Sequence, residues 1–491
     1  MLRMPSANIS KSKKIIILVC VLAVILLLLK STFFNEEGGL NFFVDVDQNK
    51  NGDTSTTTTC VSQDIAIKDG DSRIFYTKHT VQSNQSCDLF SQTRTCTQGV
   101  LSGDTSYTYS TCSADAISNT ELLSPKGEDT SIISLADGSL LMMRAAEKEV
   151  KPAFRGGRLW MLKSTDNGKT WKTLTGGEAI PYVATNAVGY AINGPSMQLL
   201  ESGRILVAYH LWTNYIPQKY STHSVEMIFS DDRGLTWKHL STVDKIKVPN
   251  GTLGFGLWEP FIETPKLRPG VVQVYYASER DDSVSCPNDP NHPSGVKKGQ
   301  DISMKESIDY GKTWGSTHVV LRNGKSREGV PTIAESPDGA LFLAHEHLRF
   351  PLCTDTRPQS GFLPSMAMSK DGGMTWTDLG PIYYPSSDFV GSGWPHIIRL
   401  TDGRLAIRFA TEITPGEDSP RKVNLLVTIN IPSMTTMPVW EKTPTVIMGN
   451  DLQWGTIFQA ANNDLIVTGG QLNMLQYYRV FPLRILPQMG Q

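Results

Sequence analysis

The 491-residue sequence contains one short motif four times, and this repetition constrains the fold more than any other feature. The motif reads Ser-x-Asp-x-Gly-x-Thr-Trp, and successive copies begin 66, 77 and 62 residues apart. In a hairpin turn, the Asp accepts backbone N–H groups, the Gly takes a left-handed conformation and the Trp packs beneath. We therefore predict structural roles, at hairpin turns, for the four motif aspartates Asp166, Asp232, Asp309 and Asp371.

A second repeat consists of two apolar strands joined by a turn, and it predicts the number of sheets. Six such units follow one another at spacings of 60 to 69 residues. Units of this length with short alternating strands predict an all-β fold, a six-bladed β-propeller over residues 115–487. The strand-like segment from Tyr477 to Pro487 is expected to close the ring against the first blade. The turns of the six units contain Gly138, Gly203, Gly270, Gly339, Gly403 and Asn463-Asp464.

Residues 1–34 have the pattern of a cytoplasmic tail and a signal-anchor, a transmembrane segment that is not cleaved. An apolar run from Ile15 to Leu29 follows several basic residues, and the stretch from Lys30 to Phe34 brings it near the length needed to span a bilayer. A cleaved signal peptide is the alternative, although no small-x-small cleavage site follows. We expect a membrane-anchored protein with its bulk outside the cytoplasm, at the cell surface, or a secreted one if the segment is cleaved.

The cysteines also favour an oxidising compartment, because six of the seven lie outside the apolar run. Residues 35–59 are polar and are predicted to form a linker. Residues 60–114 lack core-sized apolar runs, so we expect a small module stapled by two disulfides. The pairing among its four cysteines is left open, and a further bond is expected between Cys286 and Cys353. The module cysteines are Cys60, Cys87, Cys96 and Cys112.

The charge and histidine patterns bear on possible partners. Forty-six basic and 48 acidic residues give a net charge of −2, so no basic field favours nucleic acid. No cofactor and no metal site are expected, because we expect His345 and His347 to point to opposite faces of a strand and not to share an ion. The oligomeric state is left open.

Candidate site residues concentrate where each blade's first strand begins and its second strand ends, which is one rim of the central channel. Each of these residues alone is equally well explained as a solvated polar group at the rim. Their convergence on one rim, however, indicates a binding site. Two carboxylates in adjacent blades, Glu259 and Glu346, are predicted to be catalytic, one protonating a glycosidic oxygen and the other attacking or activating water. The predicted substrate-binding set, in which Asp129 and Glu328 are reserve acids, is Asp129, Asn193, His210, Trp258, Arg280, Glu328, Trp394, Arg408 and Trp454.

The four repeated motifs resemble the Asp-boxes of the sialidase superfamily, and the resemblance covers nearly the whole predicted propeller. Propellers without catalytic activity also carry such boxes. Two sialidase features are absent: Gly127-Glu128-Asp129-Thr130 stands where that pattern has Phe-Arg-Ile-Pro, and Gln453-Trp454-Gly455 stands where it has a nucleophilic Tyr. The resemblance therefore favours a site that is not built for an acidic sugar.

A closer resemblance is to the exo-1,5-arabinanases of that superfamily. It rests on Trp258-Glu259-Pro260-Phe261, on the strand from Tyr275 to Asp281, on Gly329-Val330-Pro331 and on His345-Glu346. It implies a retaining exo-glycosidase acting on arabinan-like or related glycans, with Glu259 as nucleophile and Glu346 as acid/base. His347 and an apparent insertion from Ser283 to Gly299 depart from the pattern. The alternatives are an exo-α-sialidase and a non-catalytic carbohydrate-binding or adhesive propeller at the cell surface.

Overall fold

The regular elements of the computed structural model are β-strands, so the predicted all-β class is confirmed for the described residues. No helix in the described part of the chain is long and apolar enough to cross a membrane. The expected signal-anchor and most of the linker lie outside the described residues. The structure describes residues 59–482 except 63–64, 78–79, 82–89, 109–112, 115–120, 124–127, 149–155, 175–186, 216–219, 250–255, 281–284, 288–295, 323–326, 349–360, 386–389, 413–420, 450–451 and 471–475.

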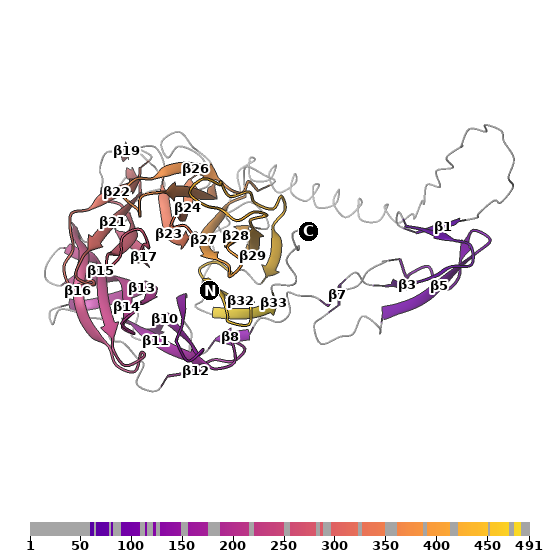
Figure 1. Ribbon diagram of the computed structural model, residues 1–491, viewed down its shortest axis with the longest axis horizontal. Helices are drawn as coiled ribbons and strands as arrows, with labels where there is room; N and C mark the ends of the chain where they lie inside the picture. The colour runs from indigo at the N-terminus through magenta and orange to yellow at the C-terminus, as the bar shows by residue number, and fades with distance from the viewer. Residues whose placement is uncertain are drawn as a thin grey trace, which may run out of the picture.

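Six four-stranded antiparallel sheets of the described chain are arranged as a ring around a common centre (Figure 1). The innermost strands β9, β13, β17, β23, β27 and β31 contact one another in this order. Sheet 1 contains β9 (Glu128–Ser134), β10 (Leu140–Lys148), β11 (Gly156–Ser164) and β12 (Lys172–Thr173), and sheet 2 contains β13 (Ala187–Leu199), β14 (Ile205–Tyr215), β15 (Tyr220–Ser230) and β16 (Lys238–Pro249). Sheet 3 contains β17 (Leu257–Glu263), β18 (Val272–Ser278), β21 (Asp301–Ser307) and β22 (His318–Leu321), and sheet 4 contains β23 (Glu328–Glu335), β24 (Leu341–Leu348), β25 (Phe362–Ser369) and β26 (Thr377–Pro381). Sheet 5 contains β27 (Ser392–Arg399), β28 (Leu405–Glu412), β29 (Arg421–Val427) and β30 (Thr445–Met448), and sheet 6 contains β31 (Ile457–Gln459), β32 (Asp464–Gly470), β33 (Gln476–Pro482) and β8 (Glu121–Leu123).

The ring closes through the strand that precedes the first sheet. β33 pairs with β8, so residues from before sheet 1 supply the outer strand of sheet 6. The hydroxyl groups of Thr130 and Thr468 share a hydrogen bond of 2.6 Å, which joins the inner parts of sheets 1 and 6. The C-terminal strand thus closes the ring as expected, against the segment leading into the first sheet.

The core of the ring lies between the sheets. One cluster of buried apolar side chains fills each interface between neighbouring sheets of the described ring. Successive residues of a strand point to opposite faces, so β10 serves two interfaces: Leu140 and Met142 pack toward sheet 6, while Leu141 and Met143 pack toward sheet 2. Both faces of these strands are buried, and both are therefore apolar.

Hydroxyl groups also tie the inner strands of neighbouring sheets together. In three cases, a Ser or Thr side chain of one inner strand accepts a backbone N–H from the next. These bonds fix the stagger between neighbouring inner strands. They thereby fix where the strand residues that surround the centre of the ring lie relative to one another. The acceptor and donor pairs are Ser131 with Met197 (2.9 Å), Ser196 with Ile262 (3.0 Å) and Thr332 with Ile397 (3.2 Å).

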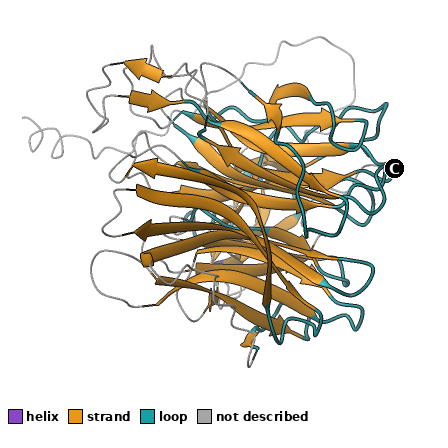
Figure 2. Ribbon diagram, turned by 90° about the vertical axis from the view of Figure 1, so that its left-hand side faces the viewer, coloured by secondary structure: helices purple, strands orange, loops and turns teal. Residues whose placement is uncertain are grey.

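The repeated motifs form the turns between the third and fourth strands of sheets 1 to 4. In the second copy, Asp232 accepts the Ser230 hydroxyl at 2.7 Å and the Thr236 backbone N–H at 2.8 Å. Gly234 has a φ of +85°, a left-handed conformation that favours glycine. These turns lie at the opposite edge of each sheet from the start of its inner strand, and Figure 2 shows the described turns gathered at one edge of the ring.

The stretch 59–114 forms small sheets of its own. Strands β1 (Thr59–Ser62) and β2 (Ile65–Lys68) pair, and β3 (Ser72–Tyr76), β5 (Ser91–Thr97) and β6 (Val100–Leu101) form a second sheet, while β4 (Thr80–Val81) pairs with β7 (Ser113–Ala114). A disulfide joins Cys60 to Cys96, and both pack with the buried ring of Phe75. Cys87 and Cys112 lie outside the described residues.

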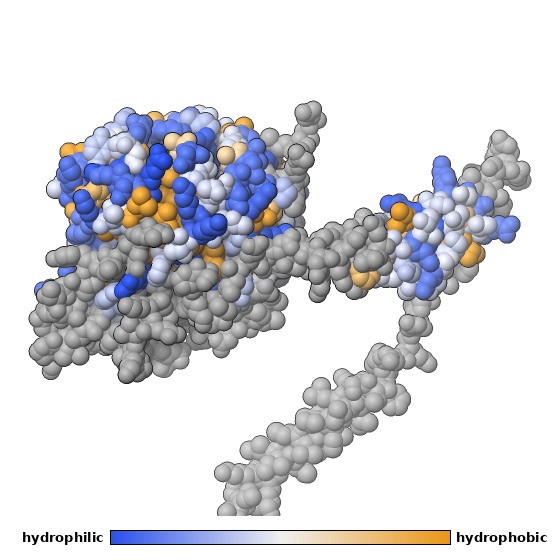
Figure 3. Space-filling view, turned by 90° about the horizontal axis from the view of Figure 1, so that it is seen from below, coloured by the Kyte–Doolittle hydropathy of each residue, from blue (hydrophilic) through white to orange (hydrophobic). Residues whose placement is uncertain are grey.

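On the face seen in Figure 3, hydrophilic residues cover much of the described surface.

Candidate functional site

A β-bulge interrupts the inner strand of each of the first five sheets, near the strand start in sheets 1, 3, 4 and 5 and in the middle of the longer β13 in sheet 2. One residue of each bulge has a positive φ, between +41° and +59°. Four of the five are not glycine, and such residues rarely adopt this conformation outside strained or functional sites. The bulges turn the chain so that these residues face the centre of the ring. They are Asp129, Gly194, Glu259, Val330 and Trp394.

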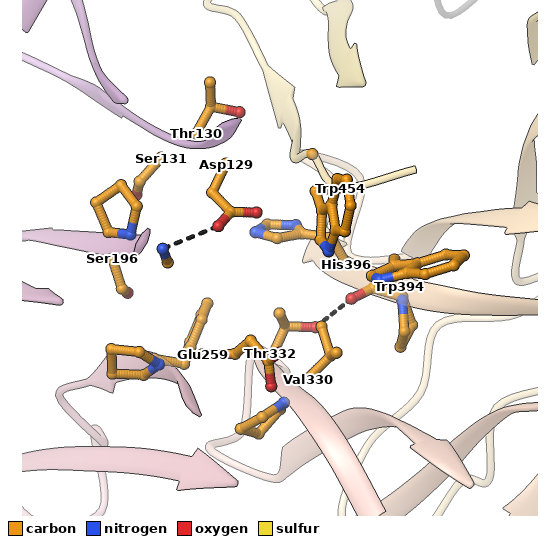
Figure 4. Close-up of a pocket in the computed structure, with 17 residues that line it drawn as sticks. Asp129, Thr130, Ser131, Ser196, Glu259, Val330, Thr332, Trp394, His396 and Trp454 are labelled. Carbon is orange, nitrogen blue, oxygen red and sulfur yellow. Dashed lines mark hydrogen bonds between the residues drawn. The ribbon is translucent and has the colours of Figure 1, made fainter. Parts of the chain in front are cut away.

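These five residues line a pocket at the centre of the ring (Figure 4). The indole rings of Trp394 and Trp454 form one wall, with centroids 5.9 Å apart and planes at 69°. Phe261 and His396 meet edge to face at 6.2 Å. The lining includes carboxylates but neither Arg nor Lys. The remaining lining residues are Thr130, Ser131, Pro195, Ser196, Pro260, Pro331, Thr332, Pro395 and Gly455.

Backbone N–H groups hold the carboxylates in and beside the pocket. Gly194 N–H donates to Asp129 Oδ2 at 2.9 Å, and Val330 N–H donates to the Glu259 carboxylate. Each donor N–H belongs to the positive-φ residue of the bulge in the next sheet. The bulge leaves this N–H unpaired with the neighbouring strand, so it can bind a carboxylate.

Glu346, near the end of β24, receives the N–H of Trp394 at 2.5 Å. Its carboxylate packs against two glycines. A Cβ added at Gly393 would lie 2.5 Å from Glu346 Oε1, and one at Gly329 would lie 3.7 Å from Oε2. Glycine at position 393 therefore makes room for this carboxylate, whereas a Cβ at position 329 would be in ordinary contact with it.

Burial raises the pKa values of three carboxyls in and beside the pocket, and repulsion by other carboxylates adds to the rise at Glu259. Burial raises the pKa of Glu259 to about 8, with further contributions from the charges of Glu346, Asp129 and Glu279. Burial likewise raises the pKa of Glu346 to about 7 and that of Asp129 to about 6. Raised carboxyl pKa values of this kind are typical of groups that take part in acid/base chemistry.

A buried polar row continues from the pocket through sheets 2 and 3. The Trp258 indole N–H donates to Glu279 at 2.8 Å, and Arg327 Nη2 donates to the same carboxylate at 2.9 Å. The Trp258 ring also contacts the His210 ring, with centroids 4.6 Å apart. The sequence analysis did not assign Arg327, because its contact with Glu279 links sheets 3 and 4.

His210 belongs to this row. Its Nδ1 lies 2.7 Å from Asn193 Oδ1, and its Nε2 lies 3.1 Å from His223 Nδ1. Burial lowers the pKa of His210 well below its usual value and that of His223 to about 4. Both imidazoles are therefore neutral. His223 was not predicted from the sequence, because it lies in the third strand of its sheet and the predicted site residues lie at the ends of first and second strands.

Three other predicted binding residues lie behind or away from the pocket. Arg408 is fully buried and donates to the carbonyl oxygens of Trp394 and Gln453, at 3.0 and 2.7 Å, so it supports the pocket wall. Arg280 donates to Asp244 at 2.8 Å and is not among the lining residues. Direct contact of Arg280 or Arg408 with a substrate stays a prediction.

Glu328, the last of the predicted set, contacts two imidazoles instead of the pocket. Its two carboxylate oxygens lie 2.9 and 2.8 Å from Nδ1 of His345 and His347. The expectation that these histidines point to opposite faces is wrong, because residues two apart on a strand share a face. The described residues contain no group of three or more metal-ligating side chains suited to an ion. Cys286 lies in the short strand β19 (Ser285–Pro287), while Cys353 lies outside the described residues.

Solved structures with similar folds include an arabinanase and a trans-sialidase. An α-L-arabinanase of Penicillium chrysogenum, complexed with arabinobiose, has a TM-score of 0.53 at 17% identity, covering 75% of this chain and 96% of its own. An intramolecular trans-sialidase of Ruminococcus gnavus, complexed with oseltamivir carboxylate, has a TM-score of 0.50 at 13% identity, covering 76% and 99%. A protein of unknown function from Dyadobacter fermentans also has a TM-score of 0.50, at 16% identity, covering 72% and 95%.

No protein-family model matches the sequence, and no curated protein matches it. At identities this low, the structural similarity shows the fold. The chain has the β-propeller fold of sialidase-like proteins, with arabinanases among its structural neighbours, as the Asp-boxes indicated.

Proposed function

We propose that this chain is an exo-acting, retaining glycoside hydrolase with a six-bladed, sialidase-like propeller, and that Glu259 and Glu346 cleave the glycosidic bond. The observation that carries the proposal is that Glu259 lines the central pocket and that the charge of the buried Glu346 carboxyl helps to raise the pKa of Glu259. Glycoside cleavage needs two such carboxyls, one able to donate a proton and one able to attack the anomeric carbon. The sialidase-like fold supports the same reaction class.

The roles within the pair rest on two different arguments. The resemblance to exo-1,5-arabinanases implies Glu259 as nucleophile and Glu346 as acid/base. In the protein without substrate, the neighbours of Glu259 are the carboxylates of Glu346, Asp129 and Glu279, which favour a proton on Glu259. Substrate binding changes these surroundings, so we keep the assignment that the resemblance implies and test it below.

The pocket suits a neutral sugar. Its described lining contains carboxylates and no Arg or Lys, so a sugar acid would be repelled and would find no cationic partner. This argues against the exo-α-sialidase alternative. The indole faces of Trp394 and Trp454 offer a surface on which the apolar face of a sugar ring can stack. An arabinan-like substrate fits these features, and one structural neighbour is complexed with arabinobiose.

We also propose, from the sequence pattern alone, that residues 1–34 anchor the protein in a membrane and that the propeller is exposed outside the cytoplasm. The disulfide between Cys60 and Cys96 supports an oxidising compartment. This placement is tested by expressing the full chain in cells, fractionating the membranes and treating intact cells with external protease. Protection of the propeller from the protease would contradict it.

The function is tested by measuring hydrolysis of aryl α-L-arabinofuranosides, linear α-1,5-arabino-oligosaccharides and α-sialosides by the full chain. We expect activity on a neutral pentoside, which Glu259→Gln and Glu346→Gln abolish. Glu263→Gln is the matched control, because Glu263 is a carboxyl of the same strand as Glu259 but lies at its other end, away from the pocket. Binding of the glycans without cleavage would support the carbohydrate-binding alternative, and equal rates in the parent and both pocket variants would refute the assignment.

A further inference from the structure

The backbone of Trp394, one of the two indole residues in the pocket wall, is held on both sides. Its N–H donates to Glu346 Oε1 at 2.5 Å, and its carbonyl oxygen accepts Arg408 Nη1 at 3.0 Å. Its φ of +52° belongs to the β-bulge that turns the residue toward the centre of the ring. These contacts leave the indole free to rotate about its side-chain bonds. Whatever restricts that rotation decides where a stacked sugar ring would lie.

Arg421 contacts the indole of Trp394. Its guanidinium carbon lies 5.0 Å from the centroid of the Trp394 ring, and the residue is only 7% exposed. Trp394 lines the pocket and Arg421 does not, so the guanidinium contacts the indole from the side away from the pocket. A planar guanidinium stacks on an aromatic face and is attracted by it, more strongly where water is excluded. Arg421 therefore backs the wall that a sugar would meet.

Glu412 and the strand pairing hold Arg421 itself in place. Arg421 begins β29 directly opposite Glu412 of β28, and its Nη2 lies 3.3 Å from Glu412 Oε1. The other carboxylate oxygen of Glu412 accepts the N–H of Gly391 at 2.8 Å, at the entry to β27. The Arg421 carbonyl oxygen accepts the N–H of Leu452 at 3.3 Å, two residues before Trp454. Arg421 thus connects the segments that carry the two wall tryptophans.

We propose that Arg421, anchored by Glu412, is a positioning residue that locks the Trp394 indole as the surface on which the sugar ring of the substrate stacks. The inference rests on the proposed function, in which a neutral sugar occupies the central pocket. Arg421 acts through the indole and does not touch the sugar. An indole that is not locked loses rotational freedom when a sugar binds, and this loss weakens binding. We therefore expect Arg421 to affect KM more than kcat.

The test is Arg421→Lys, which keeps a positive charge opposite Glu412 and loses the planar guanidinium. We expect KM for the pentoside that the parent cleaves to rise about fivefold, with kcat within about twofold of the parent, because a desolvated cation–π contact is worth a factor of that order. Arg479→Lys is the matched control. Arg479 is also buried and lies 5.6 Å from the ring centroid of Phe481, which does not line the pocket. Its variant should keep the parent KM.

Circular dichroism gives a second readout, which does not require activity. The indoles of Trp394 and Trp454, with centroids 5.9 Å apart and planes at 69°, should couple excitonically and give a couplet in the far ultraviolet. Trp394→Phe and Trp454→Phe assign the couplet by removing it. Arg421→Lys should reduce the couplet because the indole is no longer locked, and Arg479→Lys should leave it intact.

The two readouts together decide the inference. It is overturned by an unchanged couplet in folded Arg421→Lys, by an unchanged KM in an active Arg421→Lys, or by equal rises in KM in both Lys variants. A couplet reduced only in Arg421→Lys, in a protein that cleaves no glycoside, would uphold the positioning of the indole and refute only the proposed function. If Arg421→Lys does not fold, Arg421→Gln combined with Glu412→Gln leaves neither charge of the pair unpaired and provides both readouts.

Discussion

The Asp129 carboxylate accepts the backbone N–H of Gly194 at 2.9 Å, across the boundary between sheets 1 and 2. Both residues are left-handed members of β-bulges at equivalent places in their sheets. The contact recurs between sheets 3 and 4, where Val330 donates to Glu259. A bulge therefore does two things at once: it turns one side chain toward the centre, and it frees an N–H for the carboxylate of the preceding bulge.

This relationship makes Gly194 sensitive to substitution. A Cβ at Gly194 would lie 3.2 Å from the Cα of Glu259, and its φ is +59°. Gly194→Ala should cost about 1–2 kcal/mol of folding free energy from the left-handed backbone. It should also lower kcat, because it displaces both the Asp129 partner and the Glu259 backbone. Chemical denaturation and steady-state kinetics measure the two effects.

Gly203→Ala is the control for that experiment. Gly203 is a turn glycine of the same sheet with a φ of +84°, and no atom lies within 4 Å of an added Cβ. Its variant should lose a similar folding free energy and keep its kcat. Equal losses of activity in the two variants would mean that the effect of Gly194 comes from general destabilisation.

The sequence predicts the parts of this protein whose contacts are local. In the second Asp-box, Ser230 Oγ accepts the N–H of Gly234, and Asp232 binds Thr236, so the whole turn forms within seven residues. Its residue types and spacing are enough to identify it. The six strand–turn–strand units are local in the same way, which is why the all-β class could be predicted.

The site depends on contacts that sequence spacing does not encode. The left-handed backbone of Glu259 follows from a bulge, whose position depends on register with β18. Arg280 follows a buried strand and was predicted to bind substrate, but Asp244, 36 residues earlier, pairs with it. The strand register also decides that Glu328 contacts histidines of β24.

Azide rescue distinguishes the roles of the two catalytic candidates. Replacing a nucleophile or an acid/base by Ala lowers the rate by several orders of magnitude, and azide restores part of it by filling the vacated space. With activated aryl glycosides, we expect Glu346→Ala to give a glycosyl azide of retained configuration and Glu259→Ala one of inverted configuration. Product configuration is read by ¹H NMR. The reverse result would exchange the roles, and the carboxylates around Glu259 would then explain why it carries the proton.

Non-reducing peptide mapping tests the export of the chain. Cys60 and Cys96 are both nearly fully buried and bonded to each other, so their linked peptide should be recovered from protein made in an oxidising compartment. We also expect a linked peptide of Cys286 and Cys353, which was predicted from the sequence. Replacing Cys60 and Cys96 by Ala should make residues 59–114 sensitive to protease, because the described core of this stretch is small: the two cysteines pack with Ile67 and Phe75, and Leu101 and Tyr107 lie against them. Free thiols at all four positions would contradict the proposed topology.

The stability of the ring should depend on pH through Glu263, at the far end of β17 from Glu259. Burial and the neighbouring charge of Glu335 raise the pKa of Glu263 from 4.5 to about 8. A carboxyl whose pKa is higher in the folded chain than in the unfolded chain stabilises the fold while protonated. That contribution is complete below about pH 4.5 and is lost as the pH rises through about 8. Glu263→Gln keeps a neutral side chain at every pH, so its Tm should match the parent near pH 4 and exceed it increasingly toward pH 9. Glu201→Gln, at an exposed turn, is the control and should show no such divergence. Parallel Tm curves for the parent and Glu263→Gln across this range would show that Glu263 titrates alike in the folded and unfolded chains.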